Sequence, residues 1–149
     1  MRKITKESSE AFVNFKPYKK DNTEVSFGWT PKRNDETNYT FKEKETACLF
    51  LHGNNIAEIT RLSDSKETIS INLDLCGYDT RITRERINGV LDALGYDFRI
   101  ASRNYEQVLI KGRDILKLSD DSFDPDFAKR VFNSKEFVSG TDLNAITDF

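Results

Sequence analysis

Apolar and polar positions alternate along several short stretches of the chain, and this alternation predicts strands. In residues 69–75, ISINLDL, every second residue is apolar, namely Ile69, Ile71, Leu73 and Leu75. A period of two is typical of a strand with one buried face and one face in water. Segments of the same strand-like character occupy residues 22–29, 46–52, 55–62, 96–102 and 105–112.

A tight hairpin turn is predicted between the second and third of these additional segments. His52 ends one apolar run, and Gly53-Asn54 supplies two residues that tolerate positive φ before the next strand begins. We therefore expect His52, Gly53 and Asn54 to form a structural turn. His52 is the only histidine, so a general base at this position is the alternative interpretation.

Helical spacing is clearest after Gly77, which breaks the preceding strand. The apolar side chains follow the pattern i, i+3, i+4, i+7, with Thr83 as the expected N-cap and Gly95 as the residue that ends the helix. The stripe consists of Ile87, Val90, Leu91 and Leu94.

Two further helices are predicted near the ends of the chain. Thr5 is the expected cap of a helix over residues 6–15, which Pro17 stops. Asp124-Pro125 is typical of a helix start and predicts a third helix. Between the predicted elements, residues 30–44 are polar and are expected to form a mobile loop.

This order of elements predicts an α+β fold with a mainly antiparallel sheet built from hairpins and two or three short helices. We expect residues 1–112 to form the α+β domain. Residues 113–149 are expected to be a C-terminal helical extension and tail that can pack on the same domain. The periodicity of residues 134–149 is too weak to predict whether that segment is ordered.

Charge is distributed unevenly along this chain of 149 residues, although the net charge is only −2. Residues 81–113 carry seven Lys or Arg against four Asp or Glu, so this segment is locally basic. The excess is far below that of a strong nucleic-acid binder. No apolar run is long enough for a membrane-spanning helix, and no signal peptide is predicted.

No pattern predicts a metal, a cofactor or a catalytic nucleophile. The two cysteines, Cys48 and Cys76, lie in apolar stretches, as is typical of a reduced cytosolic protein. The aspartates of residues 119–127 lack the spacing and the glycine of a calcium loop. Phosphate-binding glycine loops and nucleophile elbows are also absent from the sequence.

The remaining candidate is an anion-binding or nucleic-acid-binding surface at the start of the helix after Gly77. A helix N-terminus has free N–H groups and a partial positive charge, and arginines there add donors for phosphate. We expect the guanidinium groups to face solvent together. The alternative is an ordinary helix start whose arginines pair with Asp79 and Asp92. The candidate residues are Arg81, Thr83, Arg84 and Arg86, with Arg99 and Arg103 on the following hairpin.

The chain resembles a group of small proteins encoded by bacteriophages. The shared pattern is AF…NT…LHGNxIA…G[WY]xTxxTRxR[LI]N, in which Tyr78 stands where the group also has Trp, and Ile82 stands where Thr is expected. The resemblance implies a viral origin and a location in the host cytoplasm, but it implies no activity. The matching residues are Ala11-Phe12, Asn22-Thr23, Leu51–Asn54 with Ile56-Ala57, and Gly77–Asn88.

Two functions are favoured at this point. The first is a non-catalytic viral accessory protein that binds nucleic acid or a nucleoprotein assembly through the arginines. The second is a protein that inhibits or modulates a host complex, such as a defence system or a polymerase, through its acidic tail and exposed aromatic side chains. An enzyme centred on His52 and a virion component are weaker alternatives. The sequence specifies neither the partner nor the oligomeric state. The expected aromatic residues of the second surface are Trp29, Tyr39, Phe137 and Phe149.

Overall fold

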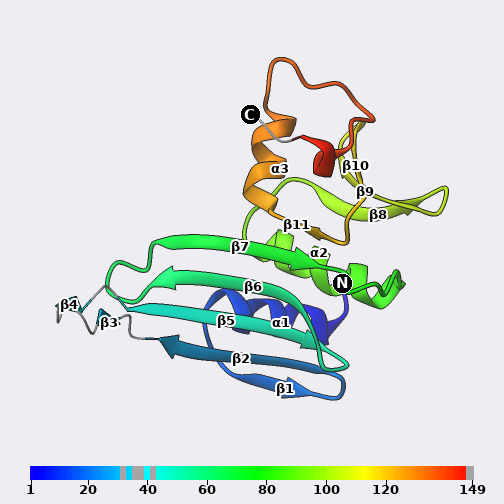
Figure 1. Ribbon diagram of the computed structural model, residues 1–149. Helices are drawn as coiled ribbons and strands as arrows, with labels where there is room; N and C mark the ends of the chain where they lie inside the picture. The colour runs from blue at the N-terminus through cyan, green and yellow to red at the C-terminus, as the bar shows by residue number, and fades with distance from the viewer. Residues whose placement is uncertain (31–32, 35–38, 41–42, 147–149) are drawn as a thin grey trace.

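The computed structural model describes the chain outside residues 31–32, 35–38, 41–42 and 147–149 (Figure 1). The larger sheet has the strand order β1-β2-β5-β6-β7-β11 and is antiparallel throughout. Its strands are β1 (Tyr18–Lys20), β2 (Thr23–Thr30), β5 (Lys44–Leu51), β6 (Asn54–Leu62), β7 (Thr68–Asp74) and β11 (Ser122–Phe123).

A second sheet has three antiparallel strands in the order β10-β9-β8. Helix α3 contacts β7 and β10, and η1 contacts β10. A two-stranded ribbon pairs β3 with β4. The bounds of these elements are β8 (Arg99–Arg103), β9 (Glu106–Lys111), β10 (Asp114–Leu118), α3 (Pro125–Phe132), η1 (Leu143–Ala145), β3 (Arg33–Asn34) and β4 (Tyr39–Thr40).

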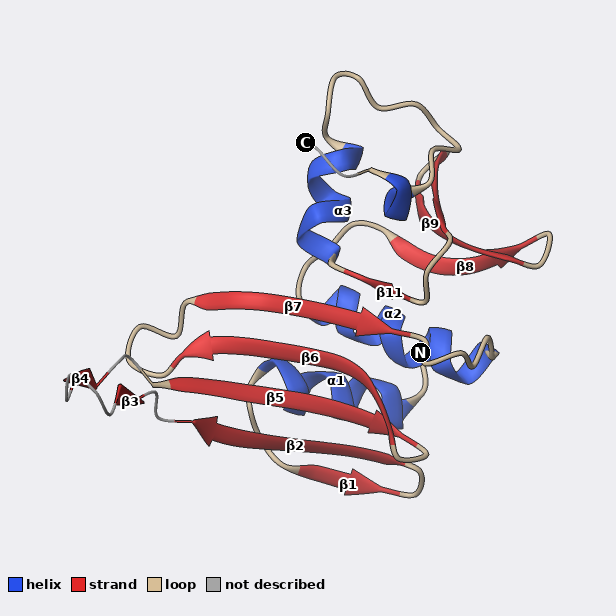
Figure 2. Cartoon of the chain, in the orientation of Figure 1, coloured by secondary structure: helices blue, strands red, loops and turns tan. Residues whose placement is uncertain are grey.

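Helices α1 (Lys3–Val13) and α2 (Arg81–Ala93) lie on the same face of the larger sheet (Figure 2). Their contacts with β2, β5 and β6 bury the apolar side of those strands. The α+β fold with antiparallel sheets is confirmed. The most deeply buried apolar side chains are Phe12, Leu49, Ile56, Leu73, Leu75, Ile87, Leu91, Ile100, Leu109, Leu116 and Leu143.

The predicted division after residue 112 falls in the turn between β9 and β10. These two strands pair in register from Lys111↔Asp114 onward. Leu116 and Leu143, from beyond the division, belong to the same hydrophobic cluster as Phe12 of α1. The C-terminal segment therefore contributes directly to the core.

Several predicted boundaries differ from those of the structure. Helix α1 begins at Lys3, and Thr5 lies fully buried inside it rather than capping it. Strands β1 and β10 were not predicted, since both are short and are recognisable only from their pairing with β2 and β9. Much of the predicted loop over residues 30–44 lies outside the described residues.

The alternation in β7 predicted the buried face correctly except at one end. Ile71 and Leu73 are buried, and Leu75 is buried just after the strand. Ile69 is 46% exposed, so its predicted burial is wrong. Spacing alone assigns a side chain to a face of the sheet, but the packed elements decide how far along the strand that face is covered.

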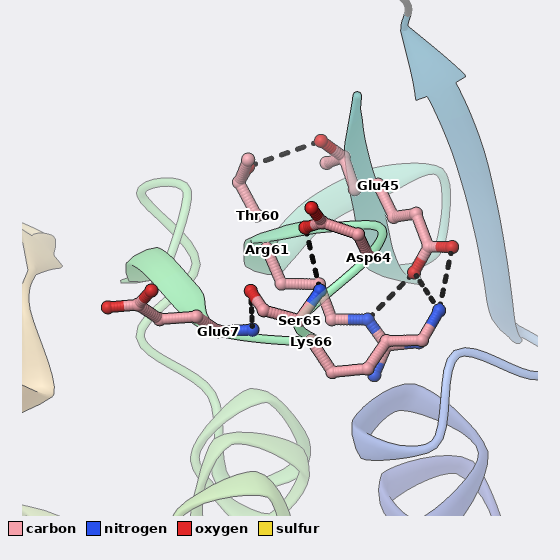
Figure 3. Close-up of polar contacts among 8 residues, drawn as sticks. Glu45, Thr60, Arg61, Asp64, Ser65, Lys66 and Glu67 are labelled. Carbon is pink, nitrogen blue, oxygen red and sulfur yellow. Dashed lines mark hydrogen bonds and ion pairs between the residues drawn. The ribbon is translucent and has the colours of Figure 1, made fainter. Parts of the chain in front are cut away.

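An ion-pair cluster joins β5, β6 and the β6–β7 turn (Figure 3). It lies near the start of β5 and the end of β6, opposite the β5–β6 turn. Arg61 Nε donates to Glu45 Oε2 at 2.8 Å, and Lys66 Nζ lies 3.2 Å from Glu45 Oε1. The Arg61 guanidinium also lies 3.6 Å from the centroid of the Phe15 ring. These contacts lower the pKa of Glu45, chiefly through the hydrogen bond from Arg61. We interpret this cluster as structural.

Candidate functional site

Helix α2 begins three residues earlier than predicted. Thr80, not Thr83, is its N-cap, and the Thr80 side chain accepts a hydrogen bond from the backbone N–H of Thr83 at 3.1 Å. The two hydroxyl oxygens lie 2.8 Å apart. Thr83 is 2% exposed and sits in the first turn of the helix. Both threonines are possible caps in sequence, and the backbone conformation of Thr80 decides between them.

Arg86 does not belong to the exposed arginine cluster, which corrects the prediction. Its side chain is 1% exposed and extends between α2, α1 and β2. Nε donates to Thr23 Oγ1 at 3.2 Å, and Nη1 donates to the Thr5 hydroxyl. The nearest carboxylate is that of Glu85, with Oε1 3.3 Å from Nη1. Arg86 therefore holds structural elements together and is unavailable to a ligand.

The environment of Arg86 is only partly compensated by negative charge. Burial lowers the pKa of the Arg86 guanidinium, and the neighbouring Glu85 carboxylate opposes that shift. Glu85 also accepts a hydrogen bond from Thr5 Oγ1 at 2.6 Å. An arginine retains its charge in such a place because its ordinary pKa is so high. Arg86 is therefore a buried charge whose hydrogen-bond partners are fixed by the fold.

The opposite side of α2 does bring arginines together. Arg81 and Arg84 of α2 and Arg99 of β8 line one open depression of about 370 Å³. It follows the outer edge of β8, an end strand of the second sheet. There Asn88 Oδ1 accepts from the Ile100 N–H at 2.7 Å, and Asn88 Nδ2 donates to the Ile100 carbonyl at 3.0 Å. The lining is completed by Met1, Glu85, Asn88, Ile100, Ala101 and Ser102.

The arginines of this depression differ in their exposure and in whether they form ion pairs. Arg84 is ion-paired with Asp79, as the alternative interpretation of the sequence anticipated. Arg81 and Arg99 are exposed. Arg103 is exposed as well, but it lies at the far end of β8 and outside the depression. The structure thus brings together three of the predicted arginines, Arg81, Arg84 and Arg99. It leaves Arg103 at the other end of the strand that carries Arg99, and it buries Arg86.

His52 and Gly53 form the turn between β5 and β6. Both have positive φ, 52° and 79°, and Leu51 pairs with Asn54 across the turn. The two central residues are therefore His52-Gly53, not Gly53-Asn54 as predicted. His52 Nε2 lies 3.2 Å from Asn22 Nδ2, which ties the turn to the loop between β1 and β2.

A second hollow, of about 310 Å³, separates this turn from the start of α2. Buried Leu51, Ile56 and Leu75 contribute its apolar lining, and His52 and Thr80 contribute polar groups. Tyr78 and Ile82, which also line it, are 55% and 38% exposed. The LHGN segment and the GYDTRIT segment, far apart in sequence, therefore meet around one pocket.

The cysteines show no sign of activation. Burial is the main cause that raises the pKa of the Cys48 thiol to about 11, with Glu58 adding to the effect. Burial and the carboxylates of Asp74 and Asp121 also raise the pKa of Cys76. Both are therefore protonated near neutral pH. In the described part of the chain, no three His, Cys, Asp or Glu side chains are grouped as metal ligands, and no helix is long and apolar enough to cross a membrane.

Comparison with known proteins assigns the chain to a family. A family model described as Kyanoviridae Gp96 protein matches residues 1–144. The chain belongs to this family. It is therefore a small phage protein, which confirms the viral origin implied by the sequence resemblance. The match continues well beyond residue 112 and includes β10, α3 and the first two residues of η1. Neither the curated proteins nor the solved structures contain a match to the chain.

The sequence reasoning missed two features of this family member that bear on the site. Thr5 and Thr23 were assigned to a cap and a strand, yet both are buried partners of Arg86. The β8–β9 turn is Asn104-Tyr105, although the predicted strands, residues 96–102 and 105–112, left residues 103–104 between them. An arginine directly beside an apolar stripe was the available signal for the first feature, since Arg86 adjoins Ile87 on the helix.

Proposed function

We propose that this phage protein is a non-catalytic accessory protein that binds nucleic acid, alone or in a nucleoprotein assembly, in the host cytoplasm. The contact surface is the basic strip formed by Arg81, Arg84, Arg99 and Arg103. The observation that supports the proposal is the open depression that Arg81 and Arg84 of α2 share with Arg99 of β8. Guanidinium groups from separate elements can bind successive phosphates of one backbone.

The strip supports moderate rather than tight binding. Glu85 also lines the depression, and Asp79 already engages Arg84. If three phosphates are neutralised, the logarithm of the association constant should fall with that of salt concentration with a slope of roughly −2 to −3. Such contacts position a nucleic acid without reading its sequence.

The proposal is tested by measuring retention on heparin and binding to labelled DNA at increasing salt. Arg81→Ala/Arg99→Ala should reduce both, because it removes the two exposed guanidinium groups of the depression. Lys129→Ala/Lys135→Ala is the control, since it removes two exposed positive charges that do not line the depression. Wild-type protein that passes through both assays unretained at low salt would rule the function out.

A second candidate is a protein that binds and modulates a host complex. The pocket flanked by exposed Tyr78 and Ile82 favours it, because apolar side chains around a hollow can receive an anchoring residue of a partner. The aromatic surface expected from the sequence receives less support. Phe137 packs on Phe132 with ring centroids 5.4 Å apart. The side chains of Trp29, Tyr39 and Phe149 lie outside the described residues.

Affinity purification from infected cells with and without nuclease separates the two candidates. Nucleic-acid binding predicts co-purifying material that nuclease releases and that Arg81→Ala/Arg99→Ala fails to capture. Host-complex binding predicts one nuclease-resistant protein that is lost when Tyr78→Ser/Ile82→Ser removes the apolar rim of the pocket.

A further inference from the structure

The turn between β8 and β9 places a tyrosine where the backbone favours glycine. Asn104 and Tyr105 have φ values of 50° and 65°, and Arg103 pairs with Glu106 across the turn. A two-residue turn with two positive φ values is most often Asn-Gly. The corresponding position of the β5–β6 turn is indeed glycine, Gly53. A tyrosine in the left-handed region is disfavoured by steric contact of its Cβ.

In the described part of the chain, no side-chain contact explains a tyrosine at this position. The Tyr105 side chain is 98% exposed. Among the residues that the structure describes, its side chain has no hydrogen bond and no aromatic partner. Tyr105 belongs to the β8–β9 turn, and this hairpin projects from the body of the protein (Figure 2). A residue that adopts a disfavoured backbone conformation without a compensating stabilising contact is a candidate for a functional role.

The charges near the turn indicate what kind of surface Tyr105 would meet. Arg99 and Arg103 point to the same side of β8, because residues two apart in a strand share a face. Arg99 also lines the depression with Arg81 and Arg84. Glu106, opposite Arg103, is engaged by Lys117, with Nζ 3.7 Å from Oε2. Strand β8 therefore carries an arginine at each end, about 13 Å apart at the rise of a strand, and Tyr105 follows two residues after Arg103.

We propose that Tyr105 stacks on an unpaired base of a single-stranded nucleic acid whose phosphates follow Arg103 and Arg99. This inference rests on the proposed function and adds a preference for single strands. A ring presented by a projecting turn can reach the flat face of an exposed base, whereas a duplex hides those faces inside its stack. Interleaved aromatic and basic side chains are how single strands are bound without sequence preference.

The test compares three probes and three variants. The probes are a fluorescein-labelled single-stranded oligothymidine, a blunt DNA duplex of equal length, and heparin, which has no bases. Tyr105→Gly should weaken single-strand binding about tenfold, the loss expected for one stacked base, and leave heparin retention unchanged. Tyr105→Phe keeps the ring and should bind like wild type. Asn104→Gly relaxes the same turn while keeping the ring, and should also bind like wild type.

The two levels of the proposal fail in different ways. If Tyr105→Gly binds the single strand as well as wild type does, the stacking role is overturned while heparin retention still supports the arginine strip. Equal loss of heparin and single-strand binding would mean that Tyr105 only shapes the hairpin, which also overturns stacking. A nuclease-resistant host protein lost with Tyr105→Gly would assign the turn to a protein partner. Wild-type protein that binds none of the three probes would end both proposals.

Discussion

The two sides of helix α2 carry the same residue type in opposite roles. Arg86 faces α1 and β2, is 1% exposed and has hydrogen-bond partners on both. Arg81 and Arg84 face the depression along β8. Successive residues of a helix are separated by 100°, so a difference of two or five positions moves a side chain from the surface to the core. Chemical identity alone therefore does not define a binding site on this helix.

Arg86→Ala should have the largest effect on stability, because it strips the Thr5 and Thr23 hydroxyls of their donor and leaves a space between α1 and α2. We expect a loss of about 3 kcal/mol in the free energy of unfolding, measured in urea. Arg81→Ala, on the exposed side, should change the same quantity by less than about 0.5 kcal/mol. Equal losses for the two variants would contradict the assignment of opposite roles.

Gly89→Ala should have the next largest effect. A Cβ at this position would lie 2.5 Å from both Ser9 Oγ and Thr5 Cγ2, where α2 approaches α1. Forcing the helices apart should lower the free energy of unfolding by about 1–3 kcal/mol and disturb the partners of Arg86. Gly28→Ala is the control, since nothing lies within 4 Å of where its new Cβ would be. A thermal unfolding temperature for Gly89→Ala equal to that of the control would show that the helices can separate without cost.

Thr80→Ala tests the end of α2 that both sides share. Losing the bond to the Thr83 N–H should cost about 1 kcal/mol of stability, as is typical of an N-cap. Thr80→Asp should restore most of it, because a carboxylate caps equally well and suits the positive end of the helix. Chemical denaturation of the two variants measures the difference. If Thr80→Ala were as stable as Thr80→Asp, another group would be capping the helix.

Much of the fold could be predicted from the sequence because the spacing of residues within single helices and strands determines it. The stripe of Ile87, Val90 and Leu91 predicted the buried face of α2, and Gly95 ends it with a φ of 83°. Asp124-Pro125 predicted α3, where the Asp124 side chain accepts from the Asp126 N–H at 2.9 Å. These features depend on neighbours within one turn of helix, so the sequence by itself determines them.

The candidate site was less accessible because its boundaries depend on distant segments. Arg86 lies at the edge of the apolar stripe, and only the approach of Thr5 and Thr23 converts it from a surface charge to a buried one. Likewise, the packing of α2 against β8 brings Arg99 and Arg81 into the lining of one depression. Sequence periodicity determined which side chains share a face of each helix or strand. Only the tertiary structure decided which of those faces is covered, because burial requires a second surface from elsewhere in the chain.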